Sequence, residues 1–335
     1  MIFPLQKSNG DWQTELANLI TDPKKLLQEL NLTSFFNASE VAQIEAFPLR
    51  VTQDFLARMQ KGNPRDPLLL QVLPQLIEQK KVAGFDEDPL QEKQFNPVPG
   101  LLHKYHGRVL ITLTGSCAIH CRYCFRRHFP YQENNPGKSG WKKLWEYISN
   151  DPSIHEVILS GGDPLLLNDK VLQQFTTQLS MIKHITRLRI HTRLPIVLPS
   201  RIDNALFSWI EATNIPIVMV VHVNHPNEIS HDLQNRLLTL KKRCHYLLNQ
   251  SVLLKDINDN VETLVTLSEK LFVCGISPYY LHVLDKVAGA AHFAVDEDEI
   301  VKLYHALAMR LPGFLVPKLV REEAGKGAKT LVKLF

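Results

Sequence analysis

The chain has 335 residues, of which 44% are hydrophobic and 21% are charged, enough for one large α/β domain with an accessory segment. Its 38 basic and 34 acidic residues give a net charge of only +4, which does not indicate a nucleic-acid-binding protein. No apolar run reaches membrane-spanning length, and the first residues, MIFPLQKSNGDW, do not resemble a signal peptide, so we expect a cytoplasmic protein with reduced thiols and no membrane contact.

Residues 1–95 are expected to form a mostly helical accessory region. Apolar residues recur at helical spacing in 12–32 and again in 68–77, between proline-rich turns. No residue of this region indicates a particular chemistry. Residues 96–335 are expected to form the domain that carries the chemistry.

Seven apolar, β-branched runs follow, separated by helix-length connections. They are 108–114, 156–160, 187–192, 215–222, 246–254, 275–284 and 314–320. Strands that alternate with helices form right-handed βαβ units, and such units build a parallel sheet. The sequence therefore predicts an α/β fold of the partial (β/α)6-type barrel class, preceded by an N-terminal helical segment.

Three of the five cysteines lie close together after the first run, as Cys117-Ala-Ile-His-Cys121-Arg-Tyr-Cys124. Three thiolates at this spacing can bind three irons of a [4Fe-4S] cluster and leave the fourth iron open for chemistry. Zinc is an alternative, but zinc sites usually take four ligands and the other two cysteines are isolated. Three buried structural cysteines are a further alternative. The spacing favours the iron–sulfur cluster.

Other unusual residues also follow the predicted strands, at the end where β/α barrels place their active sites. Gly161-Gly162-Asp163-Pro164 follows the second run, Arg193 the third and His222 the fourth, while Gln250 lies within the fifth and Asp285 follows the sixth. Each has an ordinary structural explanation as a turn, a cap or a surface charge. Their common position nevertheless indicates one site, in which the paired glycines let a bound amino acid approach the backbone.

Two lysines lie on a loop after the seventh run, in Glu323-Ala-Gly-Lys326-Gly-Ala-Lys329-Thr330. Lysines near a chain terminus are usually solvated. A lysine at this position can instead bind pyridoxal 5′-phosphate (PLP) if a phosphate site and a ring partner lie nearby. Lys104 and Arg108 are candidates for the phosphate site, and Tyr105 is a candidate ring partner.

From about residue 103 to residue 330 the chain resembles the lysine 2,3-aminomutases, which are radical S-adenosylmethionine (SAM) enzymes that also bind PLP. The matching motifs are HKYHGRVL, CAIHCRYCFRRHF, LSGGDPL, RIHTRLPIVLPSRI, VHVNHPNE, LLNQSVLLKDIND and PYYLHVLDKVAGAAHF, in this order. Within the family the chain is most similar to the branch that supplies (R)-β-lysine for elongation factor P. The resemblance implies an isomerase that converts L-lysine to (R)-β-lysine by a radical 1,2-amino shift.

The resemblance also implies roles for individual residues. The cluster ligands would be Cys117, Cys121 and Cys124, and the PLP lysine would be Lys329 rather than Lys326. The expected contacts with SAM are made by Ser160, Gly161, Gly162, Asp163, Arg193, His222 and Gln250.

For the substrate, the resemblance implies that Arg126 pairs with the carboxylate and that Asp285 receives the side-chain ammonium. Glu322 stands where the free-lysine enzymes have a second aspartate, and its longer side chain would shift the ammonium by about one methylene. The chain stops at Phe335, without the cysteine-bearing extension that binds zinc in some relatives, so we expect no zinc.

The partners expected from the resemblance are lysine, a reductant such as flavodoxin or ferredoxin, and, by a functional link, elongation factor P with its β-lysyl ligase. One alternative is another radical SAM enzyme that acts on a different amino acid or on a protein-linked lysine. A non-enzymatic iron–sulfur or RNA-binding protein is a third class, disfavoured because the chain has no basic stripe with interleaved aromatic residues.

Overall fold

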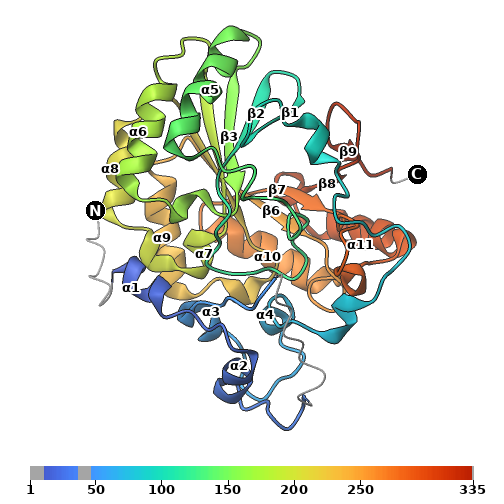
Figure 1. Ribbon diagram of the computed structural model, residues 1–335. Coiled ribbons are helices and arrows are strands. Elements are labelled where there is room, and N and C mark those ends of the chain that lie inside the picture. Colours follow the sequence, from blue (N-terminus) through green and yellow to red (C-terminus); the bar gives the residue numbers. More distant parts are fainter. Residues whose placement is uncertain (1–10, 37–46, 334–335) are drawn as a thin grey trace.

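A computed structural model describes residues 11–36 and 47–333, so most of the segment tested for a signal peptide lies outside the described residues. Its strands form one sheet in sequential order (Figure 1). Strands β2 to β8 are parallel, and β1 and β9 are added antiparallel at the two edges. The bounds are β1 (Leu101–Tyr105), β2 (Arg108–Thr114), β3 (Glu156–Gly161), β4 (Arg187–Thr192), β5 (Ile217–His222), β6 (Tyr246–Val252), β7 (Ser277–His282), β8 (Lys318–Arg321) and β9 (Thr330–Leu331).

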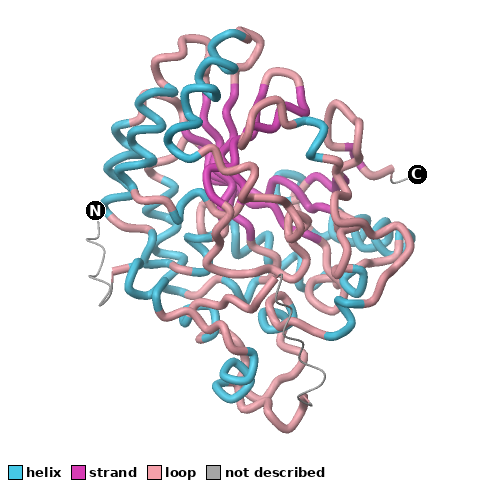
Figure 2. Tube along the Cα trace, viewed as in Figure 1, coloured by secondary structure: helices cyan, strands magenta, loops and turns pink. Residues whose placement is uncertain are grey.

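Helices connect each parallel strand to the next, and Figure 2 shows the strands inside with the helices around them. These helices are α5 (Gly137–Asn150), α6 (Asp169–Leu179), α7 (Leu194–Val197), α8 (Asn204–Ala212), α9 (His231–Lys241), α10 (Val261–Val273) and α11 (Glu297–Arg310). Short 3₁₀ turns accompany them as η3 (Pro164–Leu166), η4 (Pro199–Arg201), η5 (Pro226–Glu228), η6 (Ala291–Phe293) and η7 (Gly313–Leu315). The predicted partial (β/α)6-type barrel is confirmed, and no pairing between β1 and β9 closes it within the described residues.

The N-terminal region is less helical than its periodicity predicts. Its elements are α1 (Trp12–Ala17), α2 (Pro23–Glu29), α3 (Gln53–Leu56), α4 (Pro67–Leu70), η1 (Leu76–Gln79) and η2 (Glu92–Phe95). The pattern over 12–32 is two helices because Pro23 starts the second one and Asp22 caps it. The pattern over 68–77 contains only part of α4 and the start of η1.

Buried side chains of the N-terminal region belong to the same apolar cluster as those of the barrel. Leu26, Phe55 and Leu68, for example, are fully buried in it. The boundary proposed near residue 95 marks a change in the sequence pattern. The regions on its two sides share one hydrophobic core.

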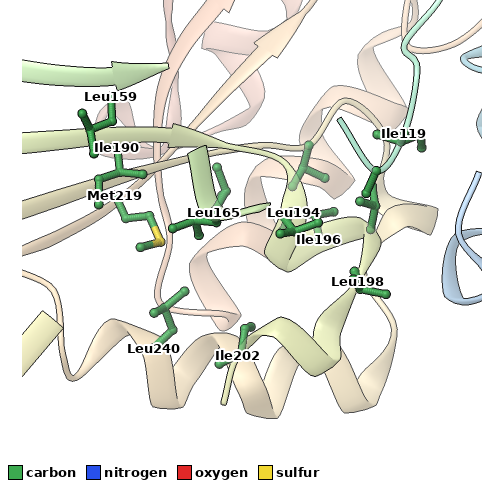
Figure 3. Packing of buried hydrophobic residues seen from close by; sticks show 14 of the residues in the cluster. Ile119, Leu159, Leu165, Ile190, Leu194, Ile196, Leu198, Ile202, Met219 and Leu240 are labelled. Atoms are coloured by element: carbon green, nitrogen blue, oxygen red, sulfur yellow. The ribbon is translucent and has the colours of Figure 1, made fainter. Parts of the chain in front are cut away.

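The sheet has an apolar outer face and a polar inner face. Leu159, Ile190 and Met219 are register partners on β3, β4 and β5, and Figure 3 shows them packed together on the side that faces the helices. Because side chains alternate along a strand, Ser160 and His191 lie on the opposite face. The inner face thus carries polar side chains, among them the predicted site residue Ser160. No helix among the described residues is long and apolar enough to cross a membrane.

Candidate functional site

The three clustered cysteines lie on the loop between β2 and α5, and this loop is docked on the end of β3. A Cβ on Gly162 would lie 2.3 Å from the carbonyl oxygen of Ser116, and one on Gly161 would lie 2.9 Å from that of Thr114. Gly161 also has a φ of +108°, which side chains rarely allow. The glycine pair is therefore required for close packing of the cysteine loop against the end of β3, whatever its role toward a bound ligand.

The three thiols of this loop are partly buried and form no disulfide bond. Burial, followed by the charge of Cys121, raises the pKa of the Cys124 thiol to about 11, and burial with Cys124 raises the pKa of Cys117 as well. The charges of the three thiols act on one another, so they lie near enough for one cluster with a thiolate on each of three irons. No three His, Cys, Asp or Glu side chains of the described residues meet at a single ion, and a four-iron cluster requires only one thiolate per iron.

Arg193, at the end of β4, is buried against the cysteine loop. Its Nη1 donates to Cys121 Sγ at 2.7 Å and to the Tyr123 hydroxyl at 2.8 Å. Its Nη2 donates to Gln71 at 2.6 Å and to Glu228 at 2.8 Å. The guanidinium thus connects the cluster loop with α4 and η5, and its predicted contact with SAM stays a prediction.

The carboxylate of Asp163 also accepts hydrogen bonds from other residues of the chain. Its carboxylate accepts bonds from the backbone N–H groups of Leu165, Arg193 and Leu194 and from the Thr192 hydroxyl. This carboxylate therefore caps η3 and the start of α7, and holds the end of β4 beside the end of β3. Its role toward SAM is likewise untested.

Polar side chains form a row across the inner face. His222 on β5, Gln250 on β6 and Tyr280 on β7 are register partners, and His222 Nε2 lies 2.9 Å from Gln250 Nε2. Burial and the charge of Arg193 lower the pKa of His222 to about 3, so its ring is neutral at physiological pH. The Nε2 atoms of His191 and His282 are buried without a hydrogen-bond partner among the described residues. Such orphaned atoms fit a polar ligand bound inside the barrel.

Glu322, which follows β8, pairs with Lys329 just before β9 and with Lys104 of β1, the strand at the opposite edge of the sheet. Its carboxylate accepts from Lys329 at 2.6 Å, from Lys104 at 3.0 Å and from the Tyr105 hydroxyl at 2.7 Å. Burial alone would raise the pKa of Glu322, but Lys329 and Lys104 lower it well below its usual range. The Arg108 guanidinium stacks 4.7 Å from the Tyr105 ring centroid. The structure thus brings together all four residues predicted for PLP with the predicted substrate residue Glu322, and three of them bond directly to Glu322.

Asp285 follows β7, close to the same lysines. Burial, and next the charge of Glu322, raise the pKa of its carboxyl to about 7, while Lys329 and Lys104 oppose the shift. A half-buried carboxyl poised near neutrality can bind an ammonium group only when it is ionised. Lys326, in contrast, is exposed.

Arg126 lies on the cysteine loop and is buried. Its Nε and Nη2 donate to the two oxygens of Glu92 at 2.8 and 2.7 Å, and its Nη1 donates to the Ser160 hydroxyl at 3.1 Å. Sequence reasoning missed Glu92, as it missed Gln71 and Glu228. Each is one carboxylate or amide in a stretch rich in turns, which does not reveal a distant partner.

Comparisons with known proteins agree with this geometry. A family model described as a 4Fe-4S single cluster domain matches residues 106–191. A protein of Escherichia coli named L-lysine 2,3-aminomutase is 49% identical over 98% of this chain and 96% of its own length. Proteins of the same name are 48% identical in Haemophilus influenzae, over 98% of this chain and 97% of that protein, and 33% identical in Clostridium subterminale, over 96% and 78%.

Among solved structures, a radical SAM methyltransferase from Sphaerobacter thermophilus matches with a TM-score of 0.45 and 13% identity. The match covers 66% of this chain and 68% of that chain. This likeness is too distant to bear on function.

Proposed function

Since this chain belongs to the L-lysine 2,3-aminomutase family, we propose that it converts L-lysine to (R)-β-lysine by moving the α-amino group to the β-carbon. The observation that supports this most directly is the group of Lys329, Glu322 and Asp285 at the strand ends. Arg126 and the cysteine loop lie at the same end of the barrel, after β2.

The enzymes of this family use a [4Fe-4S] cluster, SAM and PLP, and the donor groups described above fit them. We assign Cys117, Cys121 and Cys124 to the cluster and Lys329 to PLP. When bound, these groups supply the carbon radical that abstracts a hydrogen atom and the carbonyl carbon that carries the migrating nitrogen. Lys104 and Arg108 supply positive charge for the phosphate, and Tyr105 lies beside them.

For SAM, His222 and Gln250 are the best placed of the proposed contacts because both side chains face the polar interior. Ser160 faces it too, and there accepts a bond from Arg126. Gly161, Gly162, Asp163 and Arg193 shape the site by holding the cysteine loop, β3 and β4 together.

The substrate is held at both ends in this proposal. Arg126 binds the carboxylate of lysine, and Asp285 with Glu322 binds the side-chain ammonium. Each of these side chains is at least half buried, and the lysine chain would be fixed between two charged contacts. A lysine attached to a protein through its carboxyl would lose the first contact.

We further propose that the product serves the modification of elongation factor P and that a flavodoxin or ferredoxin supplies the electron. A functional test is restoration of β-lysylated elongation factor P, measured by mass spectrometry, in a strain that lacks its own aminomutase. If the strain does not regain β-lysylated elongation factor P although the purified protein makes β-lysine, the link to elongation factor P is wrong and the aminomutase activity stands.

The activity itself is tested with anaerobic, cluster-reconstituted protein supplied with SAM, PLP, a reductant and L-lysine. We expect (R)-β-lysine by chiral chromatography, loss of turnover in Lys329→Ala and normal turnover in Lys326→Ala, whose side chain is exposed on the same loop. Deoxyadenosine without β-lysine would keep the radical chemistry and reject lysine as the substrate.

A further inference from the structure

Glu92 and Arg126 form a bidentate ion pair that lies beside the proposed substrate carboxylate. Both side chains are buried, at 9% and 6% exposure. Glu92 occupies η2, at the end of the N-terminal region, where the sequence indicates no chemistry. The N-terminal region therefore reaches the site directly.

Glu92 and Ser160 engage three of the five N–H donors of the Arg126 guanidinium. Arginine has five N–H donors arranged in a planar fork. Glu92 takes the edge formed by Nε and Nη2, and Ser160 takes one hydrogen of Nη1. One further hydrogen on each of Nη1 and Nη2 is left for contact with another carboxylate.

The segment that carries Glu92 is fixed at several points around the site. Asp86 pairs with the loop after β7, donating to Lys286 O at 2.9 Å and accepting from Ala288 N at 2.8 Å. This contact directly follows Asp285 in the chain. At the other end of the segment, the Phe95 ring lies 5.9 Å from Lys104 Nζ. The segment 86–95 thus contacts the proposed ammonium side of the lysine site through the loop after Asp285 and through Lys104, and the proposed carboxylate side through Glu92 and Arg126.

We propose that Glu92 is a positioning residue for substrate: it fixes the plane of the Arg126 guanidinium so that the Nη1/Nη2 edge receives the lysine carboxylate. This inference rests on the proposed function, in particular on the role of Arg126. Because Arg126 and Glu92 together are neutral, recognition of the carboxylate depends on the direction of the two N–H bonds more than on net attraction.

A competing explanation is that Glu92 occupies the place of the substrate carboxylate and must leave before lysine binds. The two explanations predict opposite effects of removing its charge. Glu92→Asp keeps the charge but cannot reach both nitrogens from the same backbone position. Glu92→Gln keeps the length but replaces one acceptor with a donor that faces Arg126.

The test compares the holoenzyme's KM for L-lysine with the inhibition constant of L-lysinamide, which has no carboxylate. The ratio of the two constants isolates binding of the carboxylate from general damage, because a misfolded site weakens both ligands. We expect the preference for lysine to fall about tenfold in Arg126→Lys and by a similar factor in Glu92→Asp and Glu92→Gln. Glu87→Gln, an exposed change in the same segment, is the matched control and keeps the wild-type ratio.

The possible results distinguish the positioning role of Glu92 from the proposed role of Arg126 in binding the substrate. An unchanged ratio in both Glu92 variants, with a reduced ratio in Arg126→Lys, would overturn the positioning role alone. A higher preference for lysine in Glu92→Gln would establish competition instead. An unchanged ratio in Arg126→Lys would reject the assignment of the carboxylate to Arg126, and the inference with it.

Discussion

Asp285 is the residue whose surroundings predict a pH effect on substrate binding. Its carboxyl has a pKa of about 7 in the protein, raised from the usual 3.8 by burial and by Glu322. Below pH 7 the carboxyl is mostly protonated and does not attract an ammonium group. We expect lysine affinity, measured as KM, to improve about tenfold from pH 6 to pH 8. Asp285→Asn would bind lysine weakly at both pH values, and an equal pH dependence in that variant would assign the effect to another group.

The raised pKa of Asp285 also affects the free energy of unfolding. This effect is favourable at low pH, whereas lysine binding is favoured at high pH. A raised carboxyl pKa means that the folded protein holds the proton more tightly than the unfolded chain does. The contribution of Asp285 is therefore most favourable at low pH and is lost as pH rises from about 4 to about 7. Urea unfolding of wild type and Asp285→Asn across this range measures it, and parallel curves would contradict the assigned pKa.

At the residue scale, the sequence predicts those groups that belong to local motifs. The cysteines follow one strand and Lys329 lies on one loop, so their spacing is visible in the chain. Their partners come from far away: Glu92 lies 34 residues from Arg126, and Gln71 lies 122 residues from Arg193. Such pairs arise only when the N-terminal region packs onto the barrel, which no periodicity encodes.

Among the elements, the turn after β3 determines how the cysteine loop is seated. Gly162→Ala would place a methyl group 2.3 Å from Ser116 O, a backbone atom that cannot move aside without shifting the loop. We expect a loss of about 1–3 kcal/mol in unfolding free energy and a lower iron content after reconstitution. Gly313→Ala is the control, because no atom lies within 4 Å of its added methyl group. Equal iron content in the two variants would contradict the docking role.

The parallel strands are the elements that the sequence predicts best. The outer face of β2 to β8 packs against helices, and their apolar stretches recur at helix-length intervals, which is the pattern of parallel strands. The edge strands β1 and β9 were not predicted, because LLHKY is short and polar at its end and β9 has only two residues. The run over 314–320 begins with η7, so its strand starts at Lys318. Here local turn geometry prevails over β-propensity.

For the molecule as a whole, a buried charge cluster joins the N-terminal region to the cysteine loop. Glu78 on η1 accepts from Arg122 at 2.6 Å and from Arg127 at 2.7 Å, and its side chain is fully buried. Glu78→Gln would leave two buried guanidinium groups without a counter-charge. We expect it to lower the free energy of unfolding by about 3–5 kcal/mol, measured with urea.

The control for this prediction is Lys302→Ala, which breaks the exposed ion pair with Glu299. It should leave the unfolding free energy within error of wild type because exposed pairs contribute little. If Glu78→Gln were equally neutral, the N-terminal region would not be held to the barrel by this cluster.

The proposed reaction is an intramolecular transfer of nitrogen from the α-carbon to the β-carbon of lysine. The most direct measurement follows L-lysine labelled with ¹⁵N at the α-amino group through anaerobic turnover by the holoenzyme, with ¹³C and ¹⁵N NMR of the product. We expect β-lysine with ¹⁵N bonded to its β-carbon. Unlabelled β-lysine, or consumption of SAM with the label still on the α-carbon, would contradict it.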